Sequence, residues 1–142
     1  MRALLDVNVL IALHDRDHVH HERAADWFLA HAKKGWSSCP LTQNGCLRIM
    51  SQPAYPSPRP LAALMDMLRH STSAPAHEFW SDDTSILDTR HFRQAHMHSH
   101  RQITDIYLLA LAVKNGGRLV SFDIRIPLTA VPGAAPSHLI AL

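Results

Sequence analysis

Residues 2–13 read RALLDVNVLIAL, and this stretch decides the fold. Its first apolar run ends at Leu5 and has the length and the uniform apolar character of a buried parallel strand. Asp6 interrupts the run, and Asn8 is a good candidate N-cap for a helix over the apolar residues that follow. A strand that passes directly into a helix is typical of the start of an α/β fold.

The rest of the chain repeats this alternation. Helical patterns cover residues 18–34, 41–50, 61–69 and 103–114, and strand patterns cover residues 36–39, 77–80, 118–122 and 139–142. Prolines between residues 53 and 60 predict a rigid connector, and residues 91–102 predict a loop or an exposed helix. We therefore expect an α/β fold, a single domain over residues 1–142 built as an α/β/α sandwich with a small, mostly parallel sheet.

The composition is that of a folded protein of mild charge. With 46% hydrophobic and 18% charged residues, the chain is not disordered. A net charge of +2 is too small for binding driven by overall charge, so a nucleic-acid partner requires a local basic face. No stretch approaches the roughly 20 apolar residues that cross a bilayer, and we expect a cytoplasmic protein without a membrane partner. Cys39 and Cys46 are expected to be buried free thiols.

Three aspartates occupy positions where parallel α/β folds gather functional groups. Asp6 follows the first strand, Asp123 follows the strand pattern over 118–122, and Asp105 lies in the first turn of the apolar helix. Ligands of open parallel sheets bind beyond the carboxyl ends of the strands, so these acids can share one pocket. Each also has a structural explanation: Asp6 as a helix cap, Asp123 in a turn, and Asp105 as a complement to the helix dipole.

Asp105 carries the strongest functional argument. Its apolar neighbours Ile103 and Ile106 indicate a poorly hydrated carboxylate, and no lysine or arginine of the same helix is near enough to pair with it. Carboxylates brought together repel one another unless a divalent cation compensates, and hard oxygen ligands select Mg²⁺ or Mn²⁺. The acids therefore indicate a metal site and phosphoryl chemistry.

Several motifs, in order, resemble the VapC-type toxins of the PIN-domain family. They are residues 5–13 (LDVNVLIAL), the H-x-x-H at 18–21 with its following alanines and Trp27, residues 39–45 (CPLTQNG), residues 103–112 (ITDIYLLALA) and residues 117–123 (GRLVSFD). The resemblance covers nearly the whole chain. It implies a Mg²⁺-dependent endoribonuclease, with Mn²⁺ as an alternative ion, that acts as the toxin of a toxin–antitoxin pair.

The resemblance also implies roles for particular residues and partners. Asp6 and Asp105 are expected as metal ligands and Asp123 as the third acid of the cluster, with Asn8 and Ser121 as accessory polar groups. One or two ions would polarise an RNA phosphate and lower the pKa of an attacking water. The implied partners are an RNA substrate, a cognate antitoxin and a second copy of the chain.

Gln43 departs from the family pattern, which usually has a glutamate before the Asn-Gly of the second motif. An amide oxygen can still ligate Mg²⁺, but it removes one negative charge and cannot act as a general base. If Gln43 belongs to the catalytic site, we expect weaker metal affinity and slower cleavage than in a site with four acids. A purely structural amide is the equal alternative.

Two other functional classes remain open. Histidines cluster around residues 14–21 and 91–100, but neither cluster has a typical zinc-ligand spacing beside the acids. A second alternative is a PIN-fold module that has lost catalysis and mainly binds an antitoxin or RNA.

Arginines are the candidate ligands for RNA phosphates, because the guanidinium fork is bidentate. The candidates are Arg48, Arg59, Arg69, Arg90, Arg93 and Arg101. Trp36 and Trp80 are expected in the core, and the apolar residues Leu64, Met65 and Leu68 are candidates for contact with a partner helix or a second copy.

Overall fold

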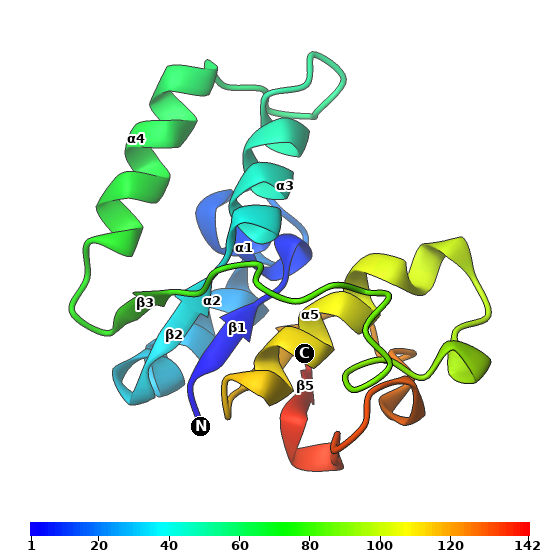
Figure 1. Cartoon of the computed structure of the whole chain (residues 1–142). Helices are drawn as coiled ribbons and strands as arrows, with labels where there is room; N and C mark the ends of the chain where they lie inside the picture. The colour runs from blue at the N-terminus through cyan, green and yellow to red at the C-terminus, as the bar shows by residue number, and fades with distance from the viewer.

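Five short parallel strands form one sheet at the centre of the molecule (Figure 1). The computed structural model describes residues 1–142. The strands are β1 (Ala3–Leu5), β2 (Trp36–Ser38), β3 (His77–Phe79), β4 (Arg118–Ser121) and β5 (Leu139–Ala141). Their order is β3-β2-β1-β4-β5, and every neighbouring pair is parallel. The predicted parallel α/β sheet is therefore confirmed, with the strand of the opening stretch in its middle.

Helices connect the strands and cover both faces of the sheet. They are α1 (Val7–His14), α2 (His21–His31), α3 (Pro40–Met50), α4 (Leu61–Thr72) and α5 (Ile103–Lys114). Short 3₁₀ turns lie at Ala32–Lys34, Gln94–His96, His100–Gln102, Leu128–Ala130 and Pro136–His138. None of the helices combines the length and the apolar character that a membrane crossing requires.

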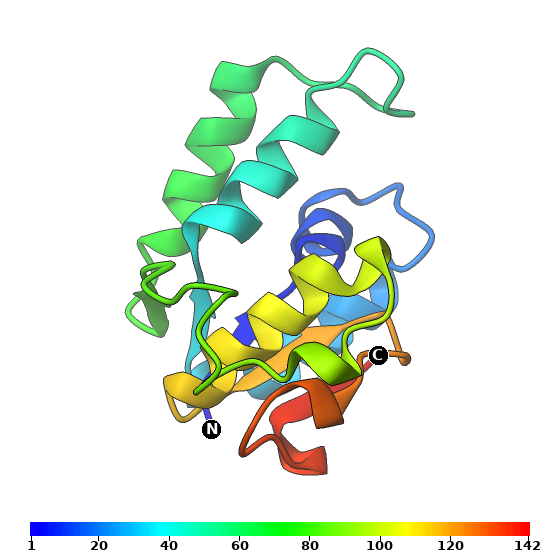
Figure 2. The same ribbon diagram turned by 45° about the vertical axis from the view of Figure 1, so that its right-hand side comes forward.

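Alternating residues of the central strands divide the core into two parts. Leu4 and Leu119 pack on the face covered by α5, whereas Leu5 and Val120 pack on the other face, with α1, α3 and α4. Figure 2 shows α5 and the segment that leads into it in front of the sheet, with α1 behind and α3 and α4 rising above as a helical hairpin. Each of these four side chains is fully buried, which contributes about 1.5–3 kcal/mol apiece.

Several predictions of local structure are confirmed. The helix over 103–114 has the predicted bounds, residues 53–60 connect α3 to α4 without helix or strand, and residues 91–102 form loop with two 3₁₀ turns. Trp36 and Trp80 are buried in the core, and both cysteines are buried and free.

Other predictions are wrong in detail. The N-cap of α1 is Asp6 rather than Asn8, which lies inside the first turn of the helix. The helix expected from residue 18 begins at His21. Leu64 and Leu68 do not face a partner, because both are buried against the chain's own core, and only Met65 of that group is substantially exposed, at 43%.

Gly45 allows α3 to approach α1 closely. A Cβ atom on Gly45 would lie 2.8 Å from Cγ2 of Val7, well inside van der Waals contact. Both residues line the cleft described below, so this contact sets the spacing between the two helices that form one of its walls.

The substitution Gly45→Ala is expected to destabilise the fold, because the added methyl group must push α3 away from Val7. Overpacking of this kind typically costs about 1–3 kcal/mol in the free energy of unfolding, which urea titration measures. In a Val7→Ala background, where the clashing methyl groups are absent, the cost of Gly45→Ala should be smaller. The same cost in both backgrounds would mean that this contact does not set the helix spacing.

Candidate active site

The site lies where the strand order reverses. The chain leaves β1 for β2 on one side and later returns through β4 on the other side of β1. Asp6 follows β1 directly, and Ser121 is the last residue of β4, so both lie at the carboxyl edge of the sheet. Crevices of parallel α/β proteins form at this position, as the sequence analysis predicts.

Asp6 is the most deeply buried acid of the cluster, with only 3% of its surface exposed. Its backbone N–H donates to the carbonyl of Val120 at 3.0 Å, which fixes the residue at the end of the ladder between β1 and β4. Its carboxylate accepts hydrogen bonds from the Val7 N–H at 2.6 Å and from the Ser121 hydroxyl at 2.6 Å. Burial nevertheless outweighs these two bonds and, with the nearby charge of Asp123, raises the pKa of Asp6 above its ordinary value.

Ser121 connects three polar groups of the site through one fully buried hydroxyl. Its Oγ donates to Asp6 and accepts from the side-chain amide of Asn8 at 3.2 Å and from the Asp123 N–H at 3.0 Å. One donor and two acceptor positions are all that a hydroxyl offers, so its hydrogen-bonding capacity is filled. Ser121, expected as an accessory polar group, therefore lies buried beneath the cluster and acts as a positioning residue.

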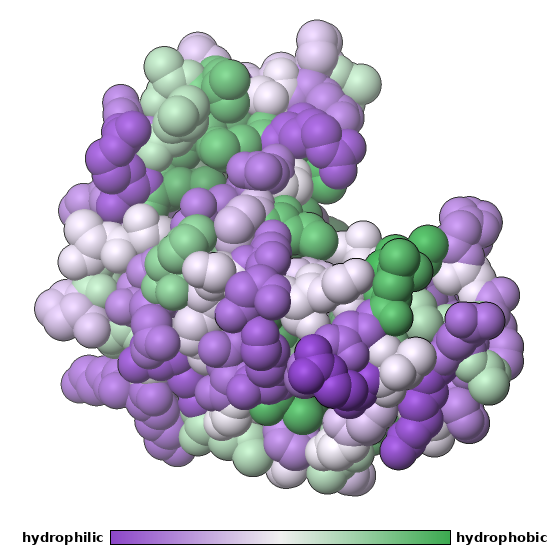
Figure 3. Space-filling model, in the orientation of Figure 1, coloured by the Kyte–Doolittle hydropathy of each residue, from purple (hydrophilic) through white to green (hydrophobic).

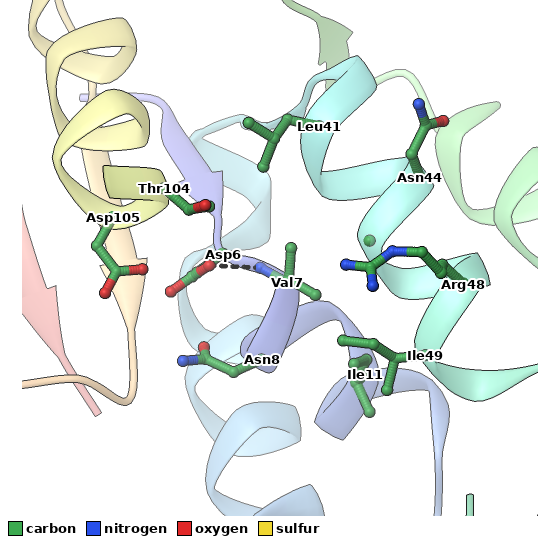
Figure 4. A pocket seen from close by; sticks show the side chains of 11 residues that line it. Asp6, Val7, Asn8, Ile11, Leu41, Asn44, Arg48, Ile49, Thr104 and Asp105 are labelled. Atoms are coloured by element: carbon green, nitrogen blue, oxygen red, sulfur yellow. Dashed lines mark hydrogen bonds between the residues drawn. The ribbon is translucent and has the colours of Figure 1, made fainter. Parts of the chain in front are cut away.

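Asp105 faces Asp6 across the cleft from the first turn of α5 (Figure 4). No hydrogen bond reaches its carboxylate. Burial raises its pKa to about 6, and the negative charges of Asp6 and Asp123 add to the shift. The expectation of a carboxylate enclosed by apolar neighbours is only partly met, because Asp105 is half-buried and Ile103 is 48% exposed.

Asp123 occupies the outer side of the cluster. Its carboxylate accepts from the Arg125 N–H at 2.8 Å and forms a longer ion pair with the Arg125 guanidinium at 3.4 Å. It remains close enough to Asp6 and Asp105 to raise the pKa of both. The structure thus brings the three predicted aspartates together.

Gln43 lies apart from the acids. Its side-chain amide donates to Ser38 Oγ at 2.9 Å, and Ser38 is in turn hydrogen-bonded to His77 at 2.8 Å. Gln43 lines a separate hollow between α3 and α4, together with Leu47 and Met65. This placement favours the structural alternative for the amide.

A cleft of about 570 Å³ opens in front of Asp6 and Asp105. Figure 3 shows this face of the molecule hollowed between the α3–α4 hairpin and the segment before α5. Asn8 and Arg48, two residues that the sequence analysis names, also line the cleft. Asn44 and Thr104 also line the cleft, and the sequence analysis does not name them as site residues. Each is next to a predicted site residue in the sequence, and this adjacency is the signal that could have found them.

The structure separates the six candidate arginines into two groups. Arg48 lines the cleft with Asp6 and takes part in none of the ion pairs, and Arg101 lines a smaller hollow beside Asp105 and Asp123. The others bind elsewhere in the protein: Arg59 to the His14 carbonyl, Arg69 to Asp66, Arg90 to Asp88 and Arg93 to the Thr129 carbonyl.

The oxygen ligands of the site fit a hard divalent cation that takes only some of its ligands from the protein. Asp6 and Asp105 offer facing carboxylates, and neither is paired with a lysine or arginine, so their repulsion is uncompensated within the chain. No group of three or more His, Cys, Asp or Glu side chains is placed to bind one ion together, in this cleft or in the histidine clusters. Mg²⁺ commonly uses one or two carboxylates and completes its shell with water and substrate phosphates, so two carboxylates suffice for it.

Comparison with known proteins identifies relatives along the whole chain. A profile of the PIN domain matches residues 3–132. Ribonuclease VapC44 of Mycobacterium tuberculosis is 56% identical over 142 residues, which is 100% of both chains. Ribonuclease VapC39 of the same species is 42% identical over 125 residues, covering 87% of this chain and 89% of the relative.

Two solved structures share the fold. A crystal structure of VapBC2 from Rickettsia felis, bound to a DNA fragment from its promoter, contains a chain that superposes with a TM-score of 0.66 at 10% identity, covering 100% of this chain and 99% of that one. VapC20 of Mycobacterium tuberculosis, a toxin that cleaves the sarcin–ricin loop, superposes with a TM-score of 0.56 at 12% identity, covering 86% of this chain and 88% of that one.

The substitution Asp105→Asn is expected to raise the melting temperature of the metal-free protein at pH 8. The pKa of Asp105, about 6 in the folded state, lies above the value of about 3.9 expected in the unfolded chain. Ionisation of Asp105 therefore costs stability as the pH rises through about 6, and this cost is absent below about pH 4. The advantage of the variant should shrink towards zero when melting is measured at pH 4.5.

The exposed acid Asp17 provides the matched control, because it lies outside the cluster. Asp17→Asn should leave the melting temperature nearly unchanged at both pH values. An equal gain for Asp105→Asn at pH 8 and pH 4.5 would contradict the electrostatic explanation.

Proposed function

Because the chain belongs to the PIN-domain family and, within it, to the VapC ribonucleases, we propose that it is a Mg²⁺-dependent endoribonuclease that acts as the toxin of a toxin–antitoxin pair. The observation that carries the proposal is the unpaired Asp105 carboxylate facing the buried Asp6 at the switch point of the sheet. Such a pair is costly to the fold and is explained by a cation that neutralises it. The relatives that match the full length or most of the chain are named as ribonucleases.

Asp6 and Asp105 would hold the metal, with Asp123 as the third acid of the cluster. When bound, Mg²⁺ or Mn²⁺ supplies charge neutralisation at the phosphate and a lowered pKa for the attacking water. Ser121 and Asn8 keep the Asp6 carboxylate in one orientation through the hydrogen bonds described above. Asp123, on the outer side of the cluster, is the acid best placed to orient a water.

Arg48 is the residue of the cleft best suited to bind the RNA backbone. Its guanidinium points towards Val7, next to Asp6, and has no ion-pair partner of its own (Figure 4). A planar guanidinium binds phosphate oxygens in a bidentate manner. This supplies the local positive charge that a net charge of only +2 does not.

The proposed partners are a cognate antitoxin and a second copy of the chain. The antitoxin is expected because the chain belongs to the VapC ribonucleases, and the similar structure from Rickettsia felis is of VapBC2. The second copy is expected because α4, the outer helix of the α3–α4 hairpin, leaves apolar surface exposed. Leu61 is 51% exposed and Met65 is 43% exposed. Figure 3 shows apolar side chains gathered over this hairpin.

The alternative function is an inactive PIN-fold module that binds an antitoxin or RNA without cleaving it. The reason to consider it is the absence of the glutamate that the family usually has at position 43. Gln43 is bonded to Ser38 and does not line the cleft of Asp6 and Asp105, which weakens that reason. Metal binding separates the two functions, since an inert module has no use for the cation.

Added Mg²⁺ or Mn²⁺ is expected to raise the melting temperature of the wild type and to support cleavage of single-stranded RNA. The substitutions Asp6→Asn and Asp105→Asn should each abolish both effects, because each removes one of the two facing carboxylates. Thermal melting across a metal titration and gel analysis of a labelled RNA measure the two effects. Asp17→Asn is again the control and should behave as the wild type.

Two results would contradict the proposal. A melting temperature that does not respond to either cation would favour the inert module. Cleavage that survives in Asp105→Asn would show that the central ligand is misassigned.

The substitution Gln43→Glu tests whether residue 43 belongs to the catalytic site. Because Gln43 binds Ser38 and lines a different hollow, we expect the Mg²⁺ concentration for half-maximal cleavage to change less than about twofold. A gain of tenfold or more in metal affinity or rate would instead favour the alternative in which Gln43 belongs to the catalytic site.

A further inference from the structure

A second cleft, of about 560 Å³, lies in the segment between β3 and α5 and has no part in the proposed catalysis. Its apolar walls come from Ile86, Leu87, Phe92, Met97 and Ile103. This volume is within the range of about 300–1,000 Å³ that small-molecule pockets occupy. Leu87 is 86% exposed, so an occupant would cover apolar surface that the fold leaves in water.

A smaller hollow of about 280 Å³ lies between this cleft and the acid cluster and shares lining residues with both clefts. Ser99 lines both the second cleft and the smaller hollow, and Asp105 lines both the smaller hollow and the catalytic cleft. Arg101 and Arg125 border the smaller hollow between them. The two clefts and the two guanidinium groups therefore lie side by side along one run of surface, which is the arrangement that a strand of nucleic acid with a phosphate at the acid cluster would need.

We propose that the second cleft, here called the base pocket, receives one unpaired base of the RNA next to the cleaved phosphate and so contributes to the choice of cleavage site. The inference rests on the proposed ribonuclease function. Proteins recognise single-stranded RNA by stacking splayed bases on aromatic rings and by hydrogen bonds to their edges. The base pocket offers both kinds of contact, because the exposed imidazole rings of His98 and His100 can stack on a base and polar side chains of the rim can reach its edge.

Phe92 supplies a fixed apolar floor beneath the exposed rings. It is buried to 3% exposure, and its ring lies nearly parallel to that of Tyr107, with centroids 6.1 Å apart and an interplanar angle of 13°. The Tyr107 hydroxyl donates to the Thr84 carbonyl at 3.2 Å, which anchors the ring pair to the loop. The floor is thus organised before any base enters, which lowers the entropic cost of binding.

The rim of the base pocket favours a base over an apolar protein side chain. Half of its lining residues carry hydrogen-bonding side chains: Thr89, Gln94, His98, Ser99 and His100. Gln94 and the two histidines are exposed and so are free to contact the edge of a base. A pocket for a leucine or phenylalanine of a partner needs no such rim. Figure 3 shows apolar side chains close to the start of α5, beside hydrophilic surface.

The test uses substitutions at exposed positions, so that the fold is kept. Leu87→Ser removes an apolar wall and Gln94→Ala removes a rim amide, and neither residue is part of the acid cluster. Leu29→Ser and Gln52→Ala are the matched controls, because Leu29 is 78% exposed and Gln52 is also exposed, and both lie outside the base pocket. Melting temperatures confirm folding, and Gln94→Ala decides the question if Leu87→Ser is unstable.

A pool of single-stranded 12-nucleotide RNAs of random sequence serves as the substrate, with sequencing of the cleaved ends. We expect the wild type to prefer certain bases at one position beside the cut. Both base-pocket variants should flatten this preference and lower kcat/KM by about fivefold or more, because each removes part of the contact with the bound base, while both controls match the wild type. An unchanged preference and rate in both variants would overturn the proposal.

The experiment distinguishes failure of the ribonuclease proposal from failure of the base pocket. If the wild type cleaves none of the pool with Mg²⁺ or Mn²⁺, the ribonuclease proposal fails. Binding of a fluorescent 12-nucleotide RNA in EDTA then tests the base pocket by itself. Weaker binding by Leu87→Ser than by Leu29→Ser would support the pocket, and equal binding would overturn it.

Discussion

The buried carboxylate of Asp6 is the constraint on which the site depends. It ends β1, caps α1 through the Val7 N–H, and accepts the hydroxyl of Ser121 from the end of β4. These bonds join the central strand, the first helix and the strand on the far side of the switch point. Because Ser121 also binds Asn8 and the Asp123 backbone, a shift of any one of these elements would be transmitted to the others.

The same arrangement sets the electrostatic character of the cleft. Asp6 is held by hydrogen bonds, Asp123 is paired with Arg125, and Asp105 has neither kind of partner. The unfavourable charge is therefore concentrated on the one acid at the open face of the cluster. A fold selected for stability alone would replace it with a neutral residue, so its presence is best explained by a ligand that the chain itself does not provide.

The sequence was sufficient for the sheet and for the three aspartates, because both follow from position relative to strand ends. Asp6 and Asp123 each follow an apolar strand pattern, and strand ends converge at one edge of a parallel sheet. Gln43, Leu64 and Leu68 could not be placed in this way, because the direction of a helical side chain changes by about 100° per residue. Only the packing of α3 and α4 decides which side each residue faces, and the close contact of Gly45 with Val7, which brings α3 against α1, depends on the folded pair.

The distribution of the acids along the chain has a consequence for synthesis. Asp6 precedes Asp105 by 99 residues and Asp123 by 117 residues, and β4 must pair with β1 before Ser121 can reach the Asp6 carboxylate. A nascent chain on the ribosome therefore carries no assembled acid cluster until β4 has been synthesised and has joined the sheet. A chain that stopped before β4 would contain Asp6 and Asp105 but would lack the Ser121 hydroxyl that holds the Asp6 carboxylate, and it would lack Asp123.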